Sequence, residues 1–413
     1  MPRTDTVVVG AGHAGLAMSR CLVDRGVDHV VLERGAIAER WRTARWDSFR
    51  LLTPNWLSRL PGWEYAGREP DGFMTAAEFE AYLSGYAGSF DAPVQMRTSV
   101  RRVERTSFGF RVRTDGGDWA ARTVVIATGY HSRPKVPDLA AGLTPGTAQL
   151  AAAHYRSPAS LPDGGVLVVG ASASGVQIAN ELALAGRQVV LAVGGHTRLP
   201  RRYRGRDILW WLDRTGALER DIDHVPDAAA ARAEPSLQLV GTSDARGIDL
   251  GTLQAAGVRL AGRLRALDGT NAGFADDLAD TLAAAQNRLT RVLGEIDRYA
   301  AAMPGSAAGP PHPPPVIAAP DTPSSADLRK AGISAVVWAT GFRPSYPWLA
   351  VPGALERDGR IRHRRGVTVV PGLYAIGLRF QSRRNSTFID GARHDAAYLA
   401  DCIAFRLAGR MAG

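Results

Sequence analysis

The sequence predicts an α/β fold with two Rossmann-like domains, because the same strand–loop–helix pattern occurs twice along the chain. The first copy has a strand at Thr6–Val9, the loop GAGHAG at 10–15 and a second strand at His29–Leu32. The second copy begins about 160 residues later, with a strand at Gly165–Val169 and the loop GASASG at 170–175. In both copies a run of apolar residues ends at glycine, as expected for buried parallel strands.

Two further segments indicate that the second domain is inserted into the first. VVIATGY at Val124–Tyr130 and VVWATGF at Val336–Phe342 are each an apolar strand that breaks at a Thr-Gly turn. We expect the chain to leave the first domain near one of these segments and to return near the other. The first domain is therefore predicted to be discontinuous, formed by residues 1–145 and 330–413, and the second to span residues 160–329.

The second domain contains a less regular stretch at about 213–303, which we expect to be a helical insertion that caps the substrate site. Within it, Phe274–Tyr299 is predicted to form one long amphipathic helix. Its apolar residues recur near helical spacing, at Leu278, Leu282, Leu289, Val292, Leu293 and Ile296. The Pro-rich stretch that follows, at 304–323, should be an extended or disordered linker.

Composition argues against several classes of protein. The 413 residues are 45% hydrophobic and 22% charged, as in ordinary globular domains. Cys21 and Cys402 form no CxxC pair and no His or Cys motif has metal-ligand spacing, so neither a disulfide framework nor a metal site is expected. No signal peptide or membrane-spanning stretch is recognisable, which predicts a cytoplasmic location. The net charge of +10 comes mostly from scattered arginines, so neither nucleic acid nor a membrane is expected as a partner.

The first glycine loop has the residues that a dinucleotide needs. Gly10, Gly12 and Gly15 would let backbone N–H groups approach a pyrophosphate at a helix N-terminus. Glu33 ends the next strand, where a carboxylate can bind ribose hydroxyls. The alternative is a glycine-rich turn that holds no ligand.

The second loop carries Gly170, Ser172 and Gly175, so a small serine stands where the middle glycine is usual. No acidic residue follows the next strand at Gln188–Val193, and Thr197 is followed by three arginines: Arg198, Arg201 and Arg202. A guanidinium matches a 2′-phosphate in charge and fork geometry, which favours NADPH over NADH. The alternative is that these arginines only solvate a surface loop.

The order of these motifs resembles that of the flavin-containing monooxygenases, including the plant YUCCA type and related bacterial flavoproteins. The resemblance covers nearly the whole chain except about 213–320. It rests on GAGHAG with Glu33, ERW at 39–41, FRLLTPNW at 49–56, both ATG segments, GASASG, and GLYAIG at 372–377. It implies an FAD domain with an inserted NADPH domain. It also implies further cofactor contacts from Arg34, Trp41, Thr128, Gly129, Ser174, Thr340, Gly341 and Gly377.

The resemblance also implies a reaction. Enzymes of this family reduce FAD with NADPH, form a C4a-(hydro)peroxyflavin with O2, and transfer one oxygen atom to a small organic substrate by N- or S-oxygenation or oxidative decarboxylation. In the family, an Asn in an LTTN-like segment supports the oxygenated flavin. The matching residue here is Asn55, in Leu52–Asn55, and it is the catalytic candidate. The alternative is a loop asparagine that caps its own turn.

One segment departs from the family pattern. The family often carries FxGxxxHSxxY before its NADPH domain, and Baeyer–Villiger enzymes carry a longer FxGxxxHxxxW form. Here Pro145–Pro158 reads PGTAQLAAAHYRSP: Tyr155 and Arg156 fit, the Phe and Gly are absent, and Ala151 replaces the His. This disfavours the Baeyer–Villiger reaction and predicts looser coupling between the two domains.

Alternatives to a monooxygenase stay open. An NADPH-dependent flavoprotein reductase of the disulfide type would need a redox CxxC, which the chain lacks. A flavoprotein oxidase or a non-catalytic redox sensor would carry the same cofactor loops. The expected partners are a small-molecule substrate and O2, and a homodimer is compatible with the sequence.

Overall fold

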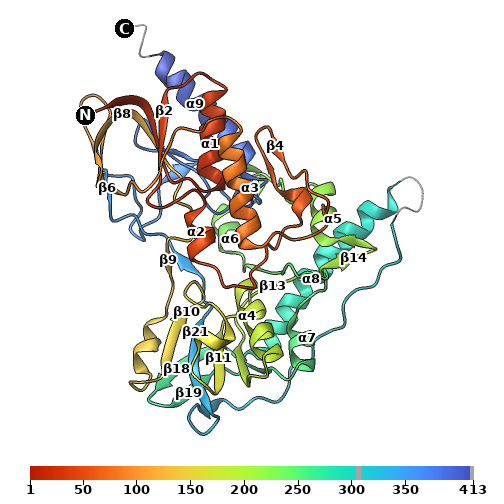
Figure 1. Cartoon of the computed structure of the whole chain (residues 1–413). Coiled ribbons are helices and arrows are strands. Elements are labelled where there is room, and N and C mark those ends of the chain that lie inside the picture. Colours follow the sequence, from red (N-terminus) through yellow and green to blue (C-terminus); the bar gives the residue numbers. More distant parts are fainter. Residues whose placement is uncertain (304–307, 410–413) are drawn as a thin grey trace.

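Two lobes, each with its own β-sheet, make up the molecule (Figure 1). The computed structural model describes residues 1–303 and 308–409. Both termini lie in the upper lobe of Figure 1, and the middle of the chain forms the lower lobe. The predicted α/β fold, with one Rossmann-like unit inserted into another, is confirmed.

The upper lobe is built on a ten-stranded sheet. β1 pairs in parallel with β2 and with β8, and β26 returns from the end of the chain to pair with β8. β6 and β7 extend β8 as an antiparallel meander, and α1 packs against α9 over the sheet. The bounds are β1 Arg3–Val9, α1 His13–Val23, β2 His29–Leu32, α3 Ala76–Gly88, β5 Val94–Gln95, β6 Val100–Arg105, β7 Phe110–Thr114, β8 Gly117–Ile126, β23 Leu349–Ala350, β26 Leu373–Ala375 and α9 Ala392–Ala408.

The lower sheet is parallel throughout, in the order β10-β21-β11-β12-β17. Its elements are β10 Ala148–Ala151, β11 Gly165–Val169, α4 Ala173–Leu184, β12 Val189–Ala192, β17 Arg259–Ala261 and β21 Ile333–Trp338. The expected boundaries at 160 and 330 are thereby corrected, because β10 and β21 both belong to this sheet. The chain crosses between lobes where β9 (Arg133–Pro134) pairs with β22 (Phe342–Arg343). An apolar run such as β21 predicts a buried strand but does not say which sheet it joins.

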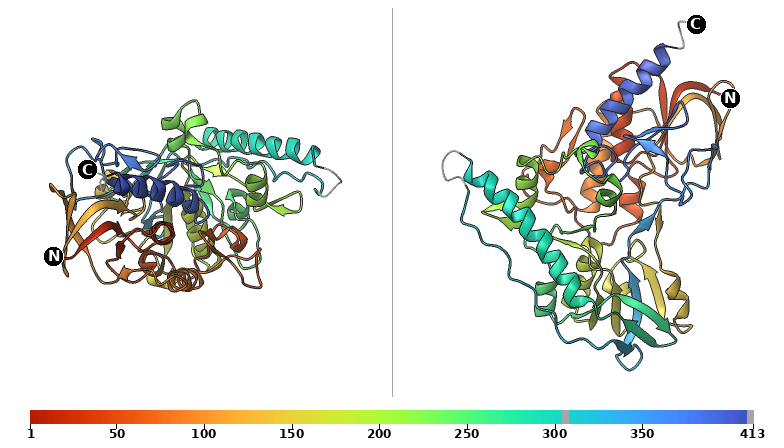
Figure 2. Two further views of the ribbon diagram at one scale, coloured as in Figure 1. Left: turned by 90° about the horizontal axis from the view of Figure 1, so that it is seen from above. Right: turned by 180° about the vertical axis from the view of Figure 1, so that it is seen from behind.

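The insertion at 213–303 is only partly helical. It contributes β17 to the lower sheet and the hairpin β18 (Leu264–Asp268) and β19 (Asn271–Phe274). The predicted helix is present as α8 (Leu278–Ala301), which starts after this hairpin. Figure 2 shows α8 running along the outside of both lobes, with the Pro-rich segment returning beside it. From residue 308 that segment has no helix or strand before β20 (Ser325–Asp327), while 304–307 lie outside the described residues.

α8 also touches the upper lobe. Its Leu289 and Leu293 share a buried cluster with Leu209 of α5 (Ile208–Arg214) and with Leu57. Leu57 belongs to the short 3-10 helix η1 (Asn55–Leu57), in the segment FRLLTPNW of the upper lobe. The insertion therefore packs on both lobes. Among the described helices, none combines the length and apolar composition that crossing a bilayer requires.

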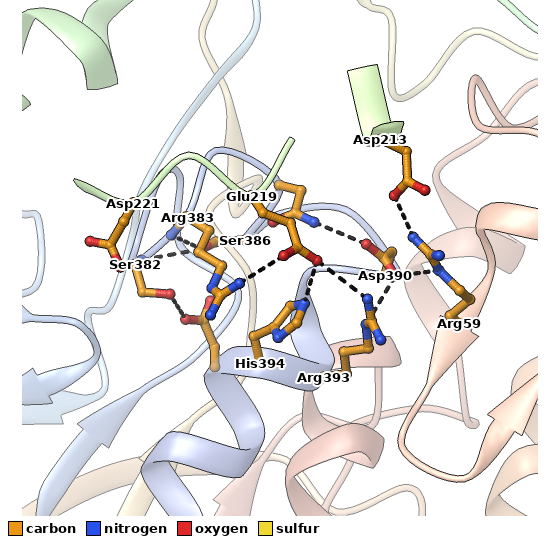
Figure 3. Close-up of polar contacts among 12 residues, drawn as sticks. Arg59, Asp213, Glu219, Asp221, Ser382, Arg383, Ser386, Asp390, Arg393 and His394 are labelled. Atoms are coloured by element: carbon orange, nitrogen blue, oxygen red, sulfur yellow. Dashed lines mark hydrogen bonds and ion pairs between the residues drawn. The ribbon is translucent and has the colours of Figure 1, made fainter. Parts of the chain in front are cut away.

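A set of ion pairs, here called the interlobe clasp, fastens the insertion to the upper lobe (Figure 3). Glu219 of the insertion lies 3.1 Å from Arg383, 3.5 Å from Arg393 and 3.1 Å from His394 of the upper lobe. Burial, followed by the charges of Arg383 and Arg393, lowers the pKa of His394. The charges of Glu219 and Asp390 oppose this shift, and the His394 ring meets Glu219 at hydrogen-bond distance.

Further acidic residues of the insertion complete the clasp. Asp213 pairs with Arg59 at 2.7 Å, and Asp221 pairs with Arg365 at 2.9 Å. The backbone also joins the insertion to the upper lobe, since the N–H of Ile222 donates to the carbonyl of Ser382 at 2.8 Å. The acidic side of the clasp comes mainly from the insertion and the basic side from the upper lobe, so charge complementarity orients the two.

The prediction of looser domain coupling than in the family stays a prediction, but the structure shows how this segment is attached. Tyr155 is fully buried and its hydroxyl donates to Glu181 at 2.9 Å. Arg156 donates to the carbonyl oxygens of Thr43 and Arg45 in the upper lobe. The departure from the family motif therefore leaves this segment anchored, and the clasp adds a second attachment that the motif does not describe.

We expect Glu219→Ala to open the insertion locally. The loss in unfolding free energy should be only about 1 kcal/mol, because partly exposed ion pairs are individually weak. It should shrink with added salt, since the Debye length falls from about 10 Å at ~0.1 M to about 3 Å at ~1 M. Limited proteolysis between 213 and 234 in low salt reports this opening.

Asp358→Ala is the matched control, because it breaks the exposed Asp358–Arg360 pair within the upper lobe. Equal cleavage of the Glu219→Ala and Asp358→Ala variants would contradict a fastening role for Glu219.

Candidate functional site

The three glycines between β1 and α1 have different structural roles. Gly10 has φ +109°, and a Cβ there would lie 2.9 Å from the carbonyl oxygen of Ala127. A Cβ on Gly15 would lie 1.9 Å from the carbonyl oxygen of Gly10, so α1 sits directly on the turn. A Cβ on Gly12 would have no neighbour within 4 Å. No side chain caps the helix at Gly12, so its first N–H groups face the open side of the loop.

The second loop repeats this arrangement between β11 and α4. Gly170 has φ +109°, and a Cβ there would lie 2.5 Å from the carbonyl oxygen of Ala339. A Cβ on Gly175 would lie 1.8 Å from the carbonyl oxygen of Gly170. The side chain of Ser172 makes no capping bond, and Ser174 lies half-buried in the first turn. Both loops therefore present an uncapped helix N-terminus, which is the geometry that binds phosphate.

Glu33 lies where the sequence predicts it, at the end of β2 beside the first loop. It is 8% exposed, and its carboxylate accepts the N–H groups of Ala11 at 2.8 Å and of Gly35 at 3.2 Å. The side chain thus braces the loop at the place where a ribose would meet it. Arg34, next along the chain, is exposed.

The Thr-Gly turns lie beside the two loops. Gly129 and Gly341 have φ of +69° and +85°, and both turns follow strands that neighbour a glycine loop. Thr128 has a buried hydroxyl without a partner among the described residues, whereas the Thr340 hydroxyl donates to the Lys135 carbonyl. Gly377, with φ +80°, approaches α1 from the C-terminal segment.

Arginine and histidine side chains gather near the first loop, a feature that the sequence did not predict. Burial, followed by the charge of Arg40, lowers the pKa of Arg45 to about 10. Burial, followed by the charges of Arg45 and Arg40, lowers the pKa of His131 to about 3. Burial also lowers the pKa of His13, in the loop itself, to about 4. Burial and the neighbouring positive charges therefore disfavour the charged forms of all three side chains. Tyr130 opposes this at Arg45 by raising its pKa. In the sequence, only His13 in GAGHAG and Arg40 in ERW could have indicated this group of basic side chains.

Three of these groups each have a buried nitrogen without a hydrogen-bond partner in the described part of the chain, although the Nη1 atoms of Arg40 and Arg45 both donate to carbonyl oxygens. Within the described residues, Nε of Arg40, Nε of Arg45 and Nε2 of His13 are buried and unpaired. The Arg45 guanidinium lies over the Trp41 ring at 4.7 Å, which places Trp41 of α2 (Glu39–Thr43) in the same group. Buried donors without acceptors are costly, so an anion is the ligand that would satisfy them. A dinucleotide diphosphate at the first loop fits this requirement.

Arg198 is not available as the sequence analysis expected. Its side chain is 4% exposed and pairs with Asp249 at 2.6 Å. It also donates to Gln286 of α8 at 2.9 Å and to the carbonyl oxygen of Pro315 at 2.8 Å. Arg198 therefore holds α8 and the Pro-rich segment onto the lower lobe.

The other two arginines need a similar correction. Arg201 has a 2% exposed side chain that pairs with Asp207 at 2.6 Å and donates to the carbonyl oxygen of Leu52 at 2.7 Å. It links the lobes instead of facing solvent. Arg202 is exposed and donates to the carbonyl oxygen of Gly205 within a small hairpin. Burial and pairing partners of this kind depend on residues far along the chain, which the local sequence did not reveal.

Asn55 is buried, with both ends of its amide engaged. Its Nδ2 donates to the carbonyl oxygen of Glu69 at 2.9 Å, and its Oδ1 accepts the N–H of Met74 at 2.8 Å. The side chain therefore holds the 69–74 loop against η1. Both bonds reach the 69–74 loop, so the side chain does not cap its own turn as the alternative expected, and the catalytic role stays a prediction.

Comparison with known proteins places this arrangement in a family. The chain is 31% identical over 402 residues to an uncharacterized CzcO-like oxidoreductase of Geobacillus kaustophilus, covering 97% of this chain and 98% of that protein. This chain belongs to the family of CzcO-like oxidoreductases. The pyridine nucleotide-disulphide oxidoreductase family matches residues 7–209. The prediction of an oxidoreductase is confirmed.

The resemblance to flavin monooxygenases is confirmed as well. The chain is 35% identical over 185 residues to probable indole-3-pyruvate monooxygenase YUCCA9 of Arabidopsis thaliana, covering 43% of this chain and 44% of that protein. Its fold is similar to that of a flavin-containing monooxygenase from Stenotrophomonas maltophilia, with a TM-score of 0.67, 20% identity and 98% of each chain covered. A structure of OTEMO in complex with FAD and NADP has a TM-score of 0.55 at 14% identity, covering 99% of this chain and 87% of that one.

Two glycine substitutions should separate ligand binding from folding. Gly12→Val should leave the unliganded fold stable but abolish FAD binding, because the side chain enters the open space where the pyrophosphate would lie. Gly15→Ala should destabilise the fold itself by about 2–3 kcal/mol, because its methyl group meets the Gly10 carbonyl. Flavin absorbance and denaturant unfolding of each variant measure the two effects. A Gly12→Val protein that still retains flavin would contradict the assignment of the first loop.

Proposed function

We propose that this chain is an NADPH-dependent FAD monooxygenase that inserts one oxygen atom from O2 into a small organic substrate. The observation that carries the proposal is the presence of two arginines, Arg40 and Arg45, beside the uncapped helix at Gly12, in a chain with a second loop of the same geometry. The buried Nε atoms of both arginines have no partner within the described residues. Bound FAD would take two electrons from NADPH and pass them to O2. The balance is NADPH, a proton, O2 and substrate giving NADP⁺, water and the oxygenated product.

In this proposal, the residues of the chain bind and orient the two cofactors. The N–H groups at Gly12, with Arg40 and Arg45, would hold the FAD diphosphate, and Glu33 the ribose. The Gly170–Gly175 loop would hold the NADPH diphosphate. The sequence resemblance to flavin monooxygenases, and a solved structure of the same fold with FAD and NADP, support this pair of cofactors.

Isotope transfer tests the proposal. Purified protein should be yellow, with NADPH oxidation coupled to O2 uptake. Under ¹⁸O2, one ¹⁸O atom should appear in an amine, a sulfide or a 2-oxo acid substrate class. Hydrogen peroxide as the sole oxygen product with every class would overturn the monooxygenase assignment and leave an oxidase.

A disulfide reductase is the second candidate, favoured by the match to the pyridine nucleotide-disulphide oxidoreductase family. The cysteines disfavour it. Burial raises the pKa of Cys21 to about 11, which disfavours its thiolate, and Cys21 and Cys402 are both free cysteines in this structure. If the chain is a disulfide reductase, NADPH oxidation should continue without O2 when a disulfide is added, and free thiols should form.

Asn55→Ala should separate a catalytic from a structural role. Loss of both amide bonds should lower the unfolding free energy by about 1–3 kcal/mol. If Asn55 also supports the oxygen step, the variant should release more peroxide per NADPH while its flavin is reduced at an unchanged rate. The ratio of product to peroxide is measured at a temperature where both proteins are folded. If the variant is less stable but its ratio of product to peroxide is unchanged, Asn55 only holds the 69–74 loop and has no part in the oxygen step.

A further inference from the structure

The second dinucleotide loop lacks a side chain at the position where Rossmann-like domains usually recognise the adenosine ribose. The residue that directly follows β12 is the apolar Val193, and Gly194 and Gly195 come next. Neither glycine can bind a ribose hydroxyl or a 2′-phosphate through a side chain. The buried and paired states of Arg198 and Arg201 remove the two nearest cations along the sequence.

A different arginine reaches this place from the neighbouring strand. β17 pairs in parallel with β12, and the N–H of Val193 donates to the carbonyl oxygen of Ala261 at 2.9 Å. The carboxyl ends of both strands therefore lie at the same edge of the sheet, which is where α/β folds bind their ligands. Arg263 lies just past the end of β17, and a Cβ on Gly195 would be 3.8 Å from its Nη2.

The Arg263 guanidinium is free to bind an anion. Its side chain is 49% exposed and meets Asp277 through Nε at 3.4 Å. Within the described part of the chain, the two Nη groups of Arg263 donate no hydrogen bond. The bidentate fork that they form is therefore unengaged. Asp277 also accepts the backbone N–H of Arg263 at 3.0 Å, which fixes the base of this side chain.

We propose that Arg263 recognises the 2′-phosphate of NADPH and makes this chain prefer NADPH over NADH. This inference rests on the proposed function of the second loop. Gly194 and Gly195 leave room for the phosphate, and the Nη groups of Arg263 form its charged wall. The residue that recognises the phosphate thus follows β17 instead of β12, some 70 residues further along the chain.

Ligand binding, without turnover, tests the inference. Dissociation constants are measured by titration calorimetry of the FAD-loaded protein with NADP⁺, NAD⁺, 2′,5′-ADP and 5′-AMP. Arg263→Ala should weaken NADP⁺ and 2′,5′-ADP by about tenfold to a hundredfold, and leave NAD⁺ and 5′-AMP unchanged. Arg263→Lys keeps the charge without the fork and should recover part of the loss.

Two neighbouring cations serve as matched controls. Arg265 is 63% exposed and 4.0 Å from the same Asp277, and Arg202 is the exposed arginine of the small hairpin. Alanine at either position should change none of the four constants. Since Arg263 is half-exposed, its variants should fold, and circular dichroism verifies this.

The outcomes separate the two proposals. A wild-type preference for NADP⁺ that survives Arg263→Ala would overturn the inference and leave the proposed function intact. Equal loss of NADP⁺ and NAD⁺ in that variant would also overturn it. Wild-type protein that binds neither dinucleotide would overturn the proposed function and the inference together.

Discussion

The close backbone contact inside each glycine loop is the constraint on which both nucleotide sites depend. In each loop the helix rests on the carbonyl oxygen of the first glycine, and a Cβ at the last glycine would lie under 2 Å from it. This contact fixes the direction of α1 and α4, so their uncapped N-termini point out of the sheet edge. The second position is free of contacts in the first loop, and that freedom leaves space for a diphosphate.

Charge placement follows from this geometry. Around the first loop, Arg40 and Arg45 have no carboxylate partner within the described residues, at a cost in desolvation that an anionic ligand would offset. The clasp uses the same kinds of groups differently, since each arginine there faces a carboxylate. The molecule thus has arginines that are paired to hold its lobes together and arginines that are unpaired beside a cofactor loop.

What the sequence could predict was local. The strands, both glycine loops, Glu33 and most of α8 follow from apolar spacing and glycine position within short windows. The sheet that β21 joins, the partners of Arg198 and the bonds of Asn55 depend on residues 14 to 169 positions away. The cations near the first loop were equally hidden, because their lack of partners is a property of three-dimensional packing.

The segment FRLLTPNW shows how a family-like motif can reflect packing between lobes. A Cβ on Gly241 of the lower lobe would lie 2.0 Å from the carbonyl oxygen of Leu51, so the two backbones are in direct contact. Arg201 donates to the carbonyl of Leu52 in the same segment and lies over the Phe73 ring at 4.8 Å. The lower lobe therefore docks on this segment through backbone groups and one buried guanidinium. These contacts give the segment a role in holding the two lobes together, whether or not Asn55 takes part in the chemistry.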